Sequence, residues 1–206
     1  MLIDGHVHVN NFFRKGRLSG MVDAYVAAGY DGIITTDHFK GKSFDEGLTL
    51  ERYWAPYKEL KKVKDFKVFP GAEVNILRTD FLVYGLYPEH FEGILEIDTV
   101  IGLVEYVHKL DGLVIQAHPH RSKNGKCRIT VSKEVDGYEL NYHPKHESNN
   151  QLTRTLVNKT KKLLTAGSDV HSGRAIGRGG MLIEGDTYAD IINAIRNHEV
   201  LVQRQI

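Results

Sequence analysis

Histidine is the residue type that stands out in this sequence, because several of its eleven histidines lie in short clusters beside Asp or Glu. The first cluster is His6-Val7-His8, in which the two histidines are two positions apart. Residues two apart on a β-strand point to the same side, so both imidazoles can bind one metal ion through neutral ring nitrogens. Alone the pair is a weak signal, because His-x-His also arises by chance.

Two more clusters follow apolar segments of the chain. Asp37 and His38 come directly after residues 32–36, and Asp169 and His171 come shortly after residues 163–165. Either cluster could be a helix cap or a turn if it stood alone. Together with His6 and His8, the two clusters indicate a metal-binding centre.

A carboxylate and a basic group follow two further apolar segments. Glu73 comes after residues 67–69, where burying a carboxylate is costly unless a cation compensates its charge. We therefore predict that Glu73 bridges two metal ions. His118, His120 and Arg121 follow residues 113–115, and the guanidinium of Arg121 is a planar fork suited to phosphate or carboxylate.

These side chains must be positioned by strands that alternate with helices. Short β-branched and apolar segments predict buried strands at residues 2–3, 32–36, 67–69, 81–84, 113–115, 138–140 and 163–165. Helical spacing of apolar residues lies between most of them, and a last helix around residues 191–195 has Asp186 or Thr187 as its expected cap. About seven parallel βα units predict a closed or nearly closed barrel, with an open doubly wound sheet as the alternative. The carboxyl ends of barrel strands converge on one face, which would join the scattered residues in one pocket.

Composition narrows the class of protein. With 206 residues, we expect one domain covering residues 1–206, and the sequence contains one cysteine, Cys127, so no internal disulfide is expected. The single cysteine fits a reducing compartment, so we expect a cytoplasmic protein. No apolar segment is long enough for a membrane span, so we expect no membrane partner. The 27 Lys and Arg residues balance 26 Asp and Glu residues, which argues against a stable nucleic-acid partner.

In order and approximate spacing, the five motifs resemble those of the PHP (polymerase and histidinol phosphatase) superfamily. The matching segments are His6-Val7-His8, Thr36-Asp37-His38, Gly71-Ala72-Glu73, Ala117-His118-Pro119-His120-Arg121 and Gly167-Ser168-Asp169-Val170-His171. The resemblance implies a distorted (β/α)7 TIM-like barrel with a two- or three-metal site. It also implies phosphoesterase activity, which most characterised members have.

The resemblance also implies metal ligands. His6, His8, Glu73 and Asp169 would hold one ion, Glu73 and His118 a second, and His38 and His171 a third. The superfamily usually has another His or Asp shortly after the first motif, but residues 9–14 here contain neither. Asp80 is our candidate for the remaining ligand of the second ion. The ions themselves would be Zn, Mn or Fe.

From these motifs we predict a phosphatase acting on a small phosphorylated substrate. The predicted catalytic residues are Glu73, Asp37, His120 and Arg121, and Arg121, Arg174 and Arg178 are predicted to bind the substrate. Glu139 and Asn141 would hydrogen-bond a ligand or a metal-bound histidine, and His143 and His146 could line the mouth of the pocket. Two other functions stay open: a metal-dependent amidohydrolase and a metal-binding module without turnover.

Overall fold

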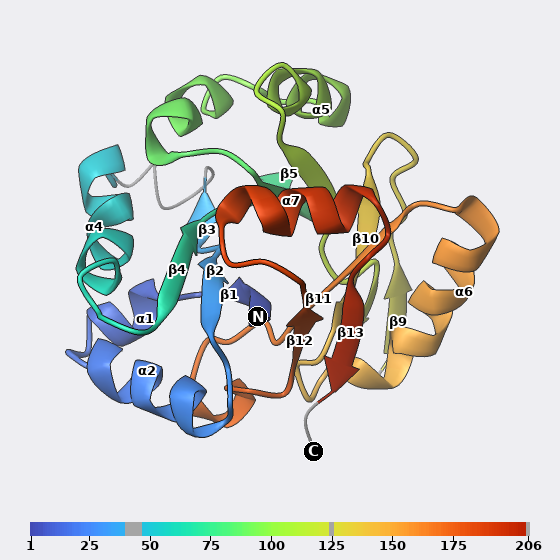
Figure 1. Cartoon of the computed structure of the whole chain (residues 1–206). Helices are drawn as coiled ribbons and strands as arrows, with labels where there is room; N and C mark the ends of the chain where they lie inside the picture. Colours follow the sequence, from blue (N-terminus) through green and yellow to red (C-terminus); the bar gives the residue numbers. More distant parts are fainter. Residues whose placement is uncertain (40–46, 124–125, 205–206) are drawn as a thin grey trace.

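The computed structural model describes residues 1–39, 47–123 and 126–204 (Figure 1). Its strands are β1 (Leu2–Val7), β2 (Gly32–Thr35), β3 (His38–Phe39), β4 (Lys67–Pro70), β5 (Ala72–Ile76), β6 (Thr79–Tyr84), β7 (Leu113–Gln116), β8 (His120–Lys123), β9 (Lys126–Ile129), β10 (Gly137–Asn141), β11 (Leu163–Gly167), β12 (Gly179–Leu182) and β13 (Leu201–Arg204). Its α-helices are α1 (Asn10–Phe13), α2 (Leu18–Ala27), α4 (Leu50–Leu60), α5 (Val100–His108), α6 (Asn150–Thr160) and α7 (Tyr188–Arg196), and its 3-10 helices are η1 (Pro88–Ile94), η2 (Glu147–Asn149) and η3 (Gly173–Ala175). Each of the seven expected strands is present.

The strands form two large sheets and one hairpin. The first sheet has the order β13-β12-β1-β2-β4, the second has the order β11-β10-β7-β6-β5-β3, and β8 pairs with β9. Strand β1 pairs in parallel with β2, and β2 in parallel with β4. In the second sheet β10 pairs in parallel with β11 and with β7.

Two links connect the two sheets, namely the passage from β4 to β5 and a bridge between β1 and the residues after β11. Strand β4 leads into β5 through Gly71, where an added Cβ would lie 2.9 Å from Cγ2 of Ile34. At the opposite side, Val7 forms a parallel bridge with Val170 just beyond β11. The structure thus confirms a mixed α/β fold with parallel strand pairs. Hydrogen bonding among the described strands does not close into one ring, so the TIM-like barrel is not confirmed.

Not every strand runs parallel to its neighbours, contrary to our expectation of uninterrupted βα units. Strand β6 pairs antiparallel with both β5 and β7, and β12 pairs antiparallel with β1 and β13. Because β6 is reversed, its N-terminal end lies at the edge where parallel strands place their carboxyl ends. Asp80, the second residue of β6, therefore reaches that edge from the start of its strand.

The helices lie around the strands in Figure 1, and apolar residues of α7 pack against strand residues in one core cluster. Ile191 and Ile195 of α7 belong to the central core together with Ile3, Leu82 and Ile115 of the sheets. The expected cap of α7 is confirmed: the Thr187 hydroxyl accepts the backbone N–H of Asp190, whose carboxylate accepts the N–H of Thr187. Within the described residues, no helix has the length and apolar character of a membrane span.

Candidate metal centre

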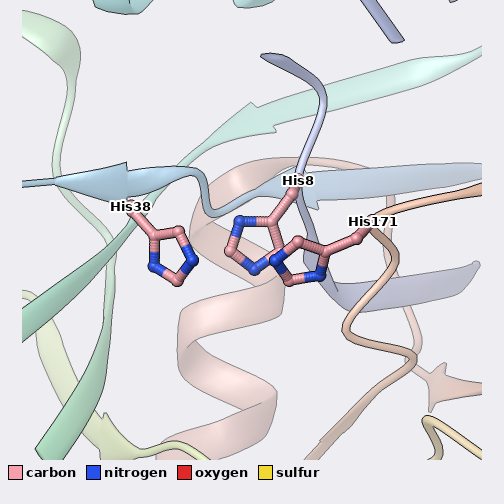
Figure 2. A group of neighbouring side chains, drawn as sticks. All are labelled: His8, His38 and His171. Atoms are coloured by element: carbon pink, nitrogen blue, oxygen red, sulfur yellow. The ribbon is translucent and has the colours of Figure 1, made fainter. Parts of the chain in front are cut away.

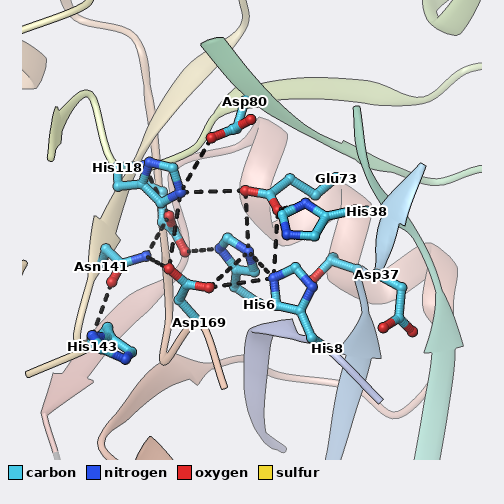
Figure 3. Close-up of polar contacts among 12 residues, drawn as sticks. His6, His8, Asp37, His38, Glu73, Asp80, His118, Asn141, His143 and Asp169 are labelled. Carbon is cyan, nitrogen blue, oxygen red and sulfur yellow. Dashed lines mark hydrogen bonds and ion pairs between the residues drawn. The ribbon is translucent and has the colours of Figure 1, made fainter. Parts of the chain in front are cut away.

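One edge of the two sheets gathers buried histidines and carboxylates from distant parts of the chain (Figure 3). Strand β1 and the residue after it supply His6 and His8, β5 supplies Glu73, and β6 supplies Asp80. His118 follows β7, and Asp169 follows β11. Each of the eight residues predicted as metal ligands belongs to this cluster or to its rim: His6, His8, His38, Glu73, Asp80, His118, Asp169 and His171.

The deepest group consists of His6, His8, Glu73 and Asp169. The Nε2 atoms of the two histidines lie 3.1 Å apart. Nε2 of His8 is 3.5 Å from Oε2 of Glu73 and 3.3 Å from Oδ1 of Asp169. Two ring nitrogens and two carboxylate oxygens thus face one small space, which is a donor set suited to a divalent transition metal.

The charges of this group are strongly coupled. Burial lowers the pKa of His6, but the carboxylates of Glu139, Asp169 and Glu73 outweigh it and raise that pKa well above its usual value. Burial raises the pKa of Glu73, but the charge of His6 and hydrogen bonds from His118 and His38 hold it well below its usual range. Without a bound cation, the buried carboxylates are compensated by protonated imidazole.

A second group shares Glu73 with the first. Nε2 of His118 lies 3.3 Å from Oε1 of Glu73 and 3.9 Å from Oδ2 of Asp80. The other oxygen of Glu73, Oε2, is buried and lies 2.7 Å from Nδ1 of His38 and 3.5 Å from Nε2 of His8. A buried carboxylate oxygen in this position fits a bound cation.

The third group consists of His8, His38 and His171 (Figure 2). The ring centroids of His8 and His171 are 3.8 Å apart, and those of His8 and His38 are 4.6 Å apart. The side chains of His38 and His171 are 57% and 42% exposed, whereas that of His8 is 3% exposed. These two histidines therefore form the rim of the site rather than its floor.

Residues around the centre hold the ligands in place. Glu139 contacts His6 through Oε1 and accepts the backbone N–H of His118 through Oε2, at 3.0 Å. The Asn141 amide lies within hydrogen-bond distance of Glu139 and of Asp169, at 3.2 and 3.4 Å. Both residues occupy the supporting positions that the sequence indicated.

Asp4 is a supporting residue for which sequence reasoning named no role. It is fully buried, and its carboxylate accepts the backbone N–H groups of His6 and Ser168 and the hydroxyl of Tyr25. Burial raises its pKa to about 6. Asp4 thereby joins β1, which carries His6, to the turn that carries Asp169. The signal in the sequence was an acid that alternates with His6 on one strand.

Two candidate ligands have an uncommon backbone conformation. His118 and Asp169 have φ angles of 30° and 51°, in the left-handed region that residues with a Cβ seldom adopt. Gly167 allows the close approach behind them, because an added Cβ would lie 2.4 Å from Cβ of His6. Strained positions of this kind cluster at functional sites.

Two predicted catalytic residues lie outside the cluster. The carboxylate of Asp37 is turned away from it (Figure 3) and accepts the backbone N–H of Asn10 at 2.9 Å. His120 begins β8, and its Nδ1 contacts the Thr153 hydroxyl of α6 at 2.8 Å.

The three predicted arginines differ in their positions. Arg121 is half-exposed, and its Nη1 lies 3.2 Å from Oδ2 of Asp80, at the edge of the second group. Arg178 pairs with Glu147 at 3.1 Å and donates to the carbonyl oxygen of Tyr142. Arg174 is exposed in η3. Of the three, Arg121 is the one that contacts a candidate metal ligand among the described residues.

One of the two histidines expected at the mouth lies beside the second group. The ring of His146 is 5.7 Å from that of His118 and 5.4 Å from that of His143. His146 is buried, and burial together with the charge of His118 lowers its pKa to about 4. A neutral imidazole is therefore present next to His118.

Comparison with known proteins gives a family and a fold. Residues 147–200 match the PHP-associated family (PHP_C), and no curated protein matches the chain. The crystal structure of PsfC from Pseudomonas syringae is similar, with a TM-score of 0.67 and 18% identity over 99% of this chain and 91% of PsfC. A proposed metal-dependent phosphoesterase from Bifidobacterium adolescentis is similar with a TM-score of 0.52 and 13% identity, over 94% of each chain.

The family match covers about a quarter of the chain, and the structural similarity covers nearly all of it. Both agree with the ordered motifs between residues 4 and 171. The comparisons therefore support the resemblance to the PHP superfamily that the motifs indicated.

Proposed function

We propose that this chain is a metal-dependent phosphoesterase whose residues 1–206 act as one domain. It hydrolyses a phosphate monoester or small phosphodiester with two or three divalent ions, of Zn, Mn or Fe. The observation that carries the proposal is the position of Glu73. Its Oε1 faces His6 and His118, whereas its Oε2 faces His8 and His38. One buried carboxylate is thus common to adjacent groups of ligands, as in two-metal sites that cleave phosphate esters.

The residues present fit such ions, because imidazole nitrogens and carboxylate oxygens converge in three adjoining groups. When bound, the ions would lower the pKa of a water molecule and neutralise the oxygens of the phosphate. His6, His8, Glu73 and Asp169 would hold the first ion, and Glu73, Asp80 and His118 the second. His38 and His171, with His8, would serve a third.

The protein's own groups would orient these ligands and the substrate. Glu139 fixes the ring of His6, and Asn141 contacts the carboxylate of Asp169. Arg121 lies next to Asp80 and would present its remaining guanidinium nitrogens to a phosphate at the second group. Arg174 would contact an anionic substrate from the exposed loop, whereas Arg178 would support that loop through Glu147.

The fold relationship supports the same reaction class. The Bifidobacterium adolescentis protein, described as a proposed metal-dependent phosphoesterase, shares the fold over nearly its whole length. An amidohydrolase of this type uses a carboxylated lysine as its bridging group, whereas the bridging position here holds Glu73. A module without turnover would need no substrate-binding arginine beside the centre.

The test is hydrolysis of a panel of phosphate esters by protein loaded with manganese, zinc or iron. We expect at least one ester to be turned over, with loss of activity on chelation and recovery on adding metal. Glu73→Gln keeps the shape of the side chain but removes its charge, so turnover should fall by orders of magnitude. Glu184→Gln, an exposed glutamate outside the cluster, is the matched control. Equal turnover by both variants, or no hydrolysis by any metal form, would rule out the proposed reaction.

A further inference from the structure

A cavity of about 140 Å³ adjoins the third group of histidines on its solvent side. Its wall combines His8, His38 and His171 with Asp37, Leu48 and three residues of the α1 segment, Asn10, Asn11 and Arg14. A water molecule occupies roughly 30 Å³ in the liquid, so the cavity has room for about four to five non-hydrogen atoms. A phosphoryl group has that size.

The polar groups of the wall favour an anion. Asp37 is the one carboxylate among the lining residues, and its Oδ1 is already occupied by the backbone N–H of Asn10. Nδ1 of His38 is directed to Glu73 and Nδ1 of His171 to Asp169, so both rings are held by carboxylates outside the cavity wall. Arg14 and Asn11 also line the cavity, and their guanidinium and amide groups are hydrogen-bond donors.

Arg14 differs from Arg121 in its ion pairing. Arg121 is paired with Asp80, whereas no described residue forms an ion pair with Arg14, which is exposed at the end of α1. An unpaired guanidinium presents both arms of its fork to a ligand and loses no existing partner on binding. The first helix therefore carries a cation at the mouth of the centre.

We infer that this cavity is the site that receives the phosphoryl group of the substrate, with Arg14 as its anion-binding residue and Asn11 as a second donor. The inference rests on the proposed function, since it names how that centre holds its substrate. Arg14 is a binding residue and not a metal ligand. Its loss should therefore weaken phosphate affinity and leave metal content unchanged.

The experiment measures binding of inorganic phosphate to the manganese-loaded protein, by calorimetry and by the shift in Tm. Losing a hydrogen bond between two charged groups lowers affinity by roughly 10- to 100-fold, and this is the expected effect of Arg14→Ala. Arg14→Lys should recover part of the affinity. Arg17→Ala is the matched control, because Arg17 is an exposed arginine three positions away that does not line the cavity.

Phosphate affinities of Arg14→Ala and Arg17→Ala within twofold of each other would overturn the inference, as would absence of phosphate binding to the wild type. The proposed function fails separately. If phosphate binding depends on Arg14 but no ester is hydrolysed, the subsite stands and the phosphoesterase does not. If esters are hydrolysed and Arg14→Ala binds phosphate as tightly as the wild type, the proposed function stands and the subsite does not. A measured stoichiometry of manganese in each variant keeps the two readouts independent.

Discussion

Nδ1 of His6 lies 2.8 Å from Oε1 of Glu139, a residue 133 positions later in the chain, and both side chains are fully buried. The contact places the ring proton on Nδ1, because an ionised carboxylate is an acceptor only. Nε2 is then the nitrogen that faces His8, Glu73 and Asp169. Glu139 thus determines which side of His6 is available to a metal ion.

Replacing this carboxylate should weaken metal binding without abolishing the fold. In Glu139→Gln we expect metal affinity to fall by roughly 10- to 100-fold, the usual effect of losing a partner that orients a ligating histidine. Competition with a chromophoric chelator measures the change, and Glu184→Gln serves as the control. Unchanged affinity in Glu139→Gln would mean that His6 is oriented by the surrounding packing alone.

Metal binding should release protons. The pKa values of His6, His38 and His118 are raised, because neighbouring carboxylates outweigh the effect of burial on each ring. A raised pKa means that the metal-free centre retains its protons to higher pH, so an ion must displace them and affinity should increase as pH rises. Calorimetry in two buffers of different ionisation enthalpy counts the released protons. A count of zero near neutral pH would contradict the assigned charge state.

Replacing Arg121 should reduce turnover far more than stability. Its pair with Asp80 is half-exposed, so Arg121→Ala should lower stability by under about 1 kcal/mol. If the guanidinium also contacts the phosphate in the transition state, kcat/KM should fall by roughly 100- to 1,000-fold. Arg121→Lys should restore part of it, since lysine cannot form the bidentate contact. A loss under about threefold with metal content intact would exclude this contact.

Asp4 should contribute more to the stability of the protein at acidic pH than at neutral pH. Its pKa rises from 3.8 to about 6 on folding, so the native protein binds this proton more tightly than the unfolded chain. The contribution of Asp4 to the free energy of unfolding is therefore largest below about pH 4 and declines as pH rises to about 6. Asn cannot ionise, so Asp4→Asn should gain stability relative to the wild type across this range, by up to about 3 kcal/mol. Urea unfolding at pH 4 and pH 7 measures the difference, and a constant gap would contradict the raised pKa.

The strands and the cluster were largely predictable, and for one physical reason. An apolar segment followed by an ionisable residue places that residue at the end of a buried strand, and such ends meet at one edge. This logic located His6, Glu73, His118 and Asp169 without any knowledge of pairing. It does not locate Asp80, which precedes the apolar part of β6 and is named through the family resemblance, because the sequence does not reveal that β6 runs antiparallel.

What the sequence left undetermined is the direction of side chains beyond the strand ends. After His118, whose φ is 30°, the chain enters β8, and His120 at its start contacts Thr153 of α6. Asp37 precedes the two-residue strand β3, and its carboxylate accepts the backbone N–H of Asn10 at the start of α1. Both contacts depend on backbone turns, which no periodic pattern of residues in the sequence predicts. Whether hydrogen bonding closes the two sheets into one barrel likewise depends on long-range strand pairing, which a single sequence does not specify.

The position of β1 has a consequence for biosynthesis. Strand β1 is an interior strand of its sheet, and its partner β12, at Gly179–Leu182, is synthesised long after it. Asp169, which completes the deepest group with His6 and His8, is also made late. A nascent chain that ends before these residues has its first two histidines without the acid that faces them. The deepest group therefore cannot assemble until synthesis has passed Asp169, so a metal ion bound there would not guide the folding of the segments made before it.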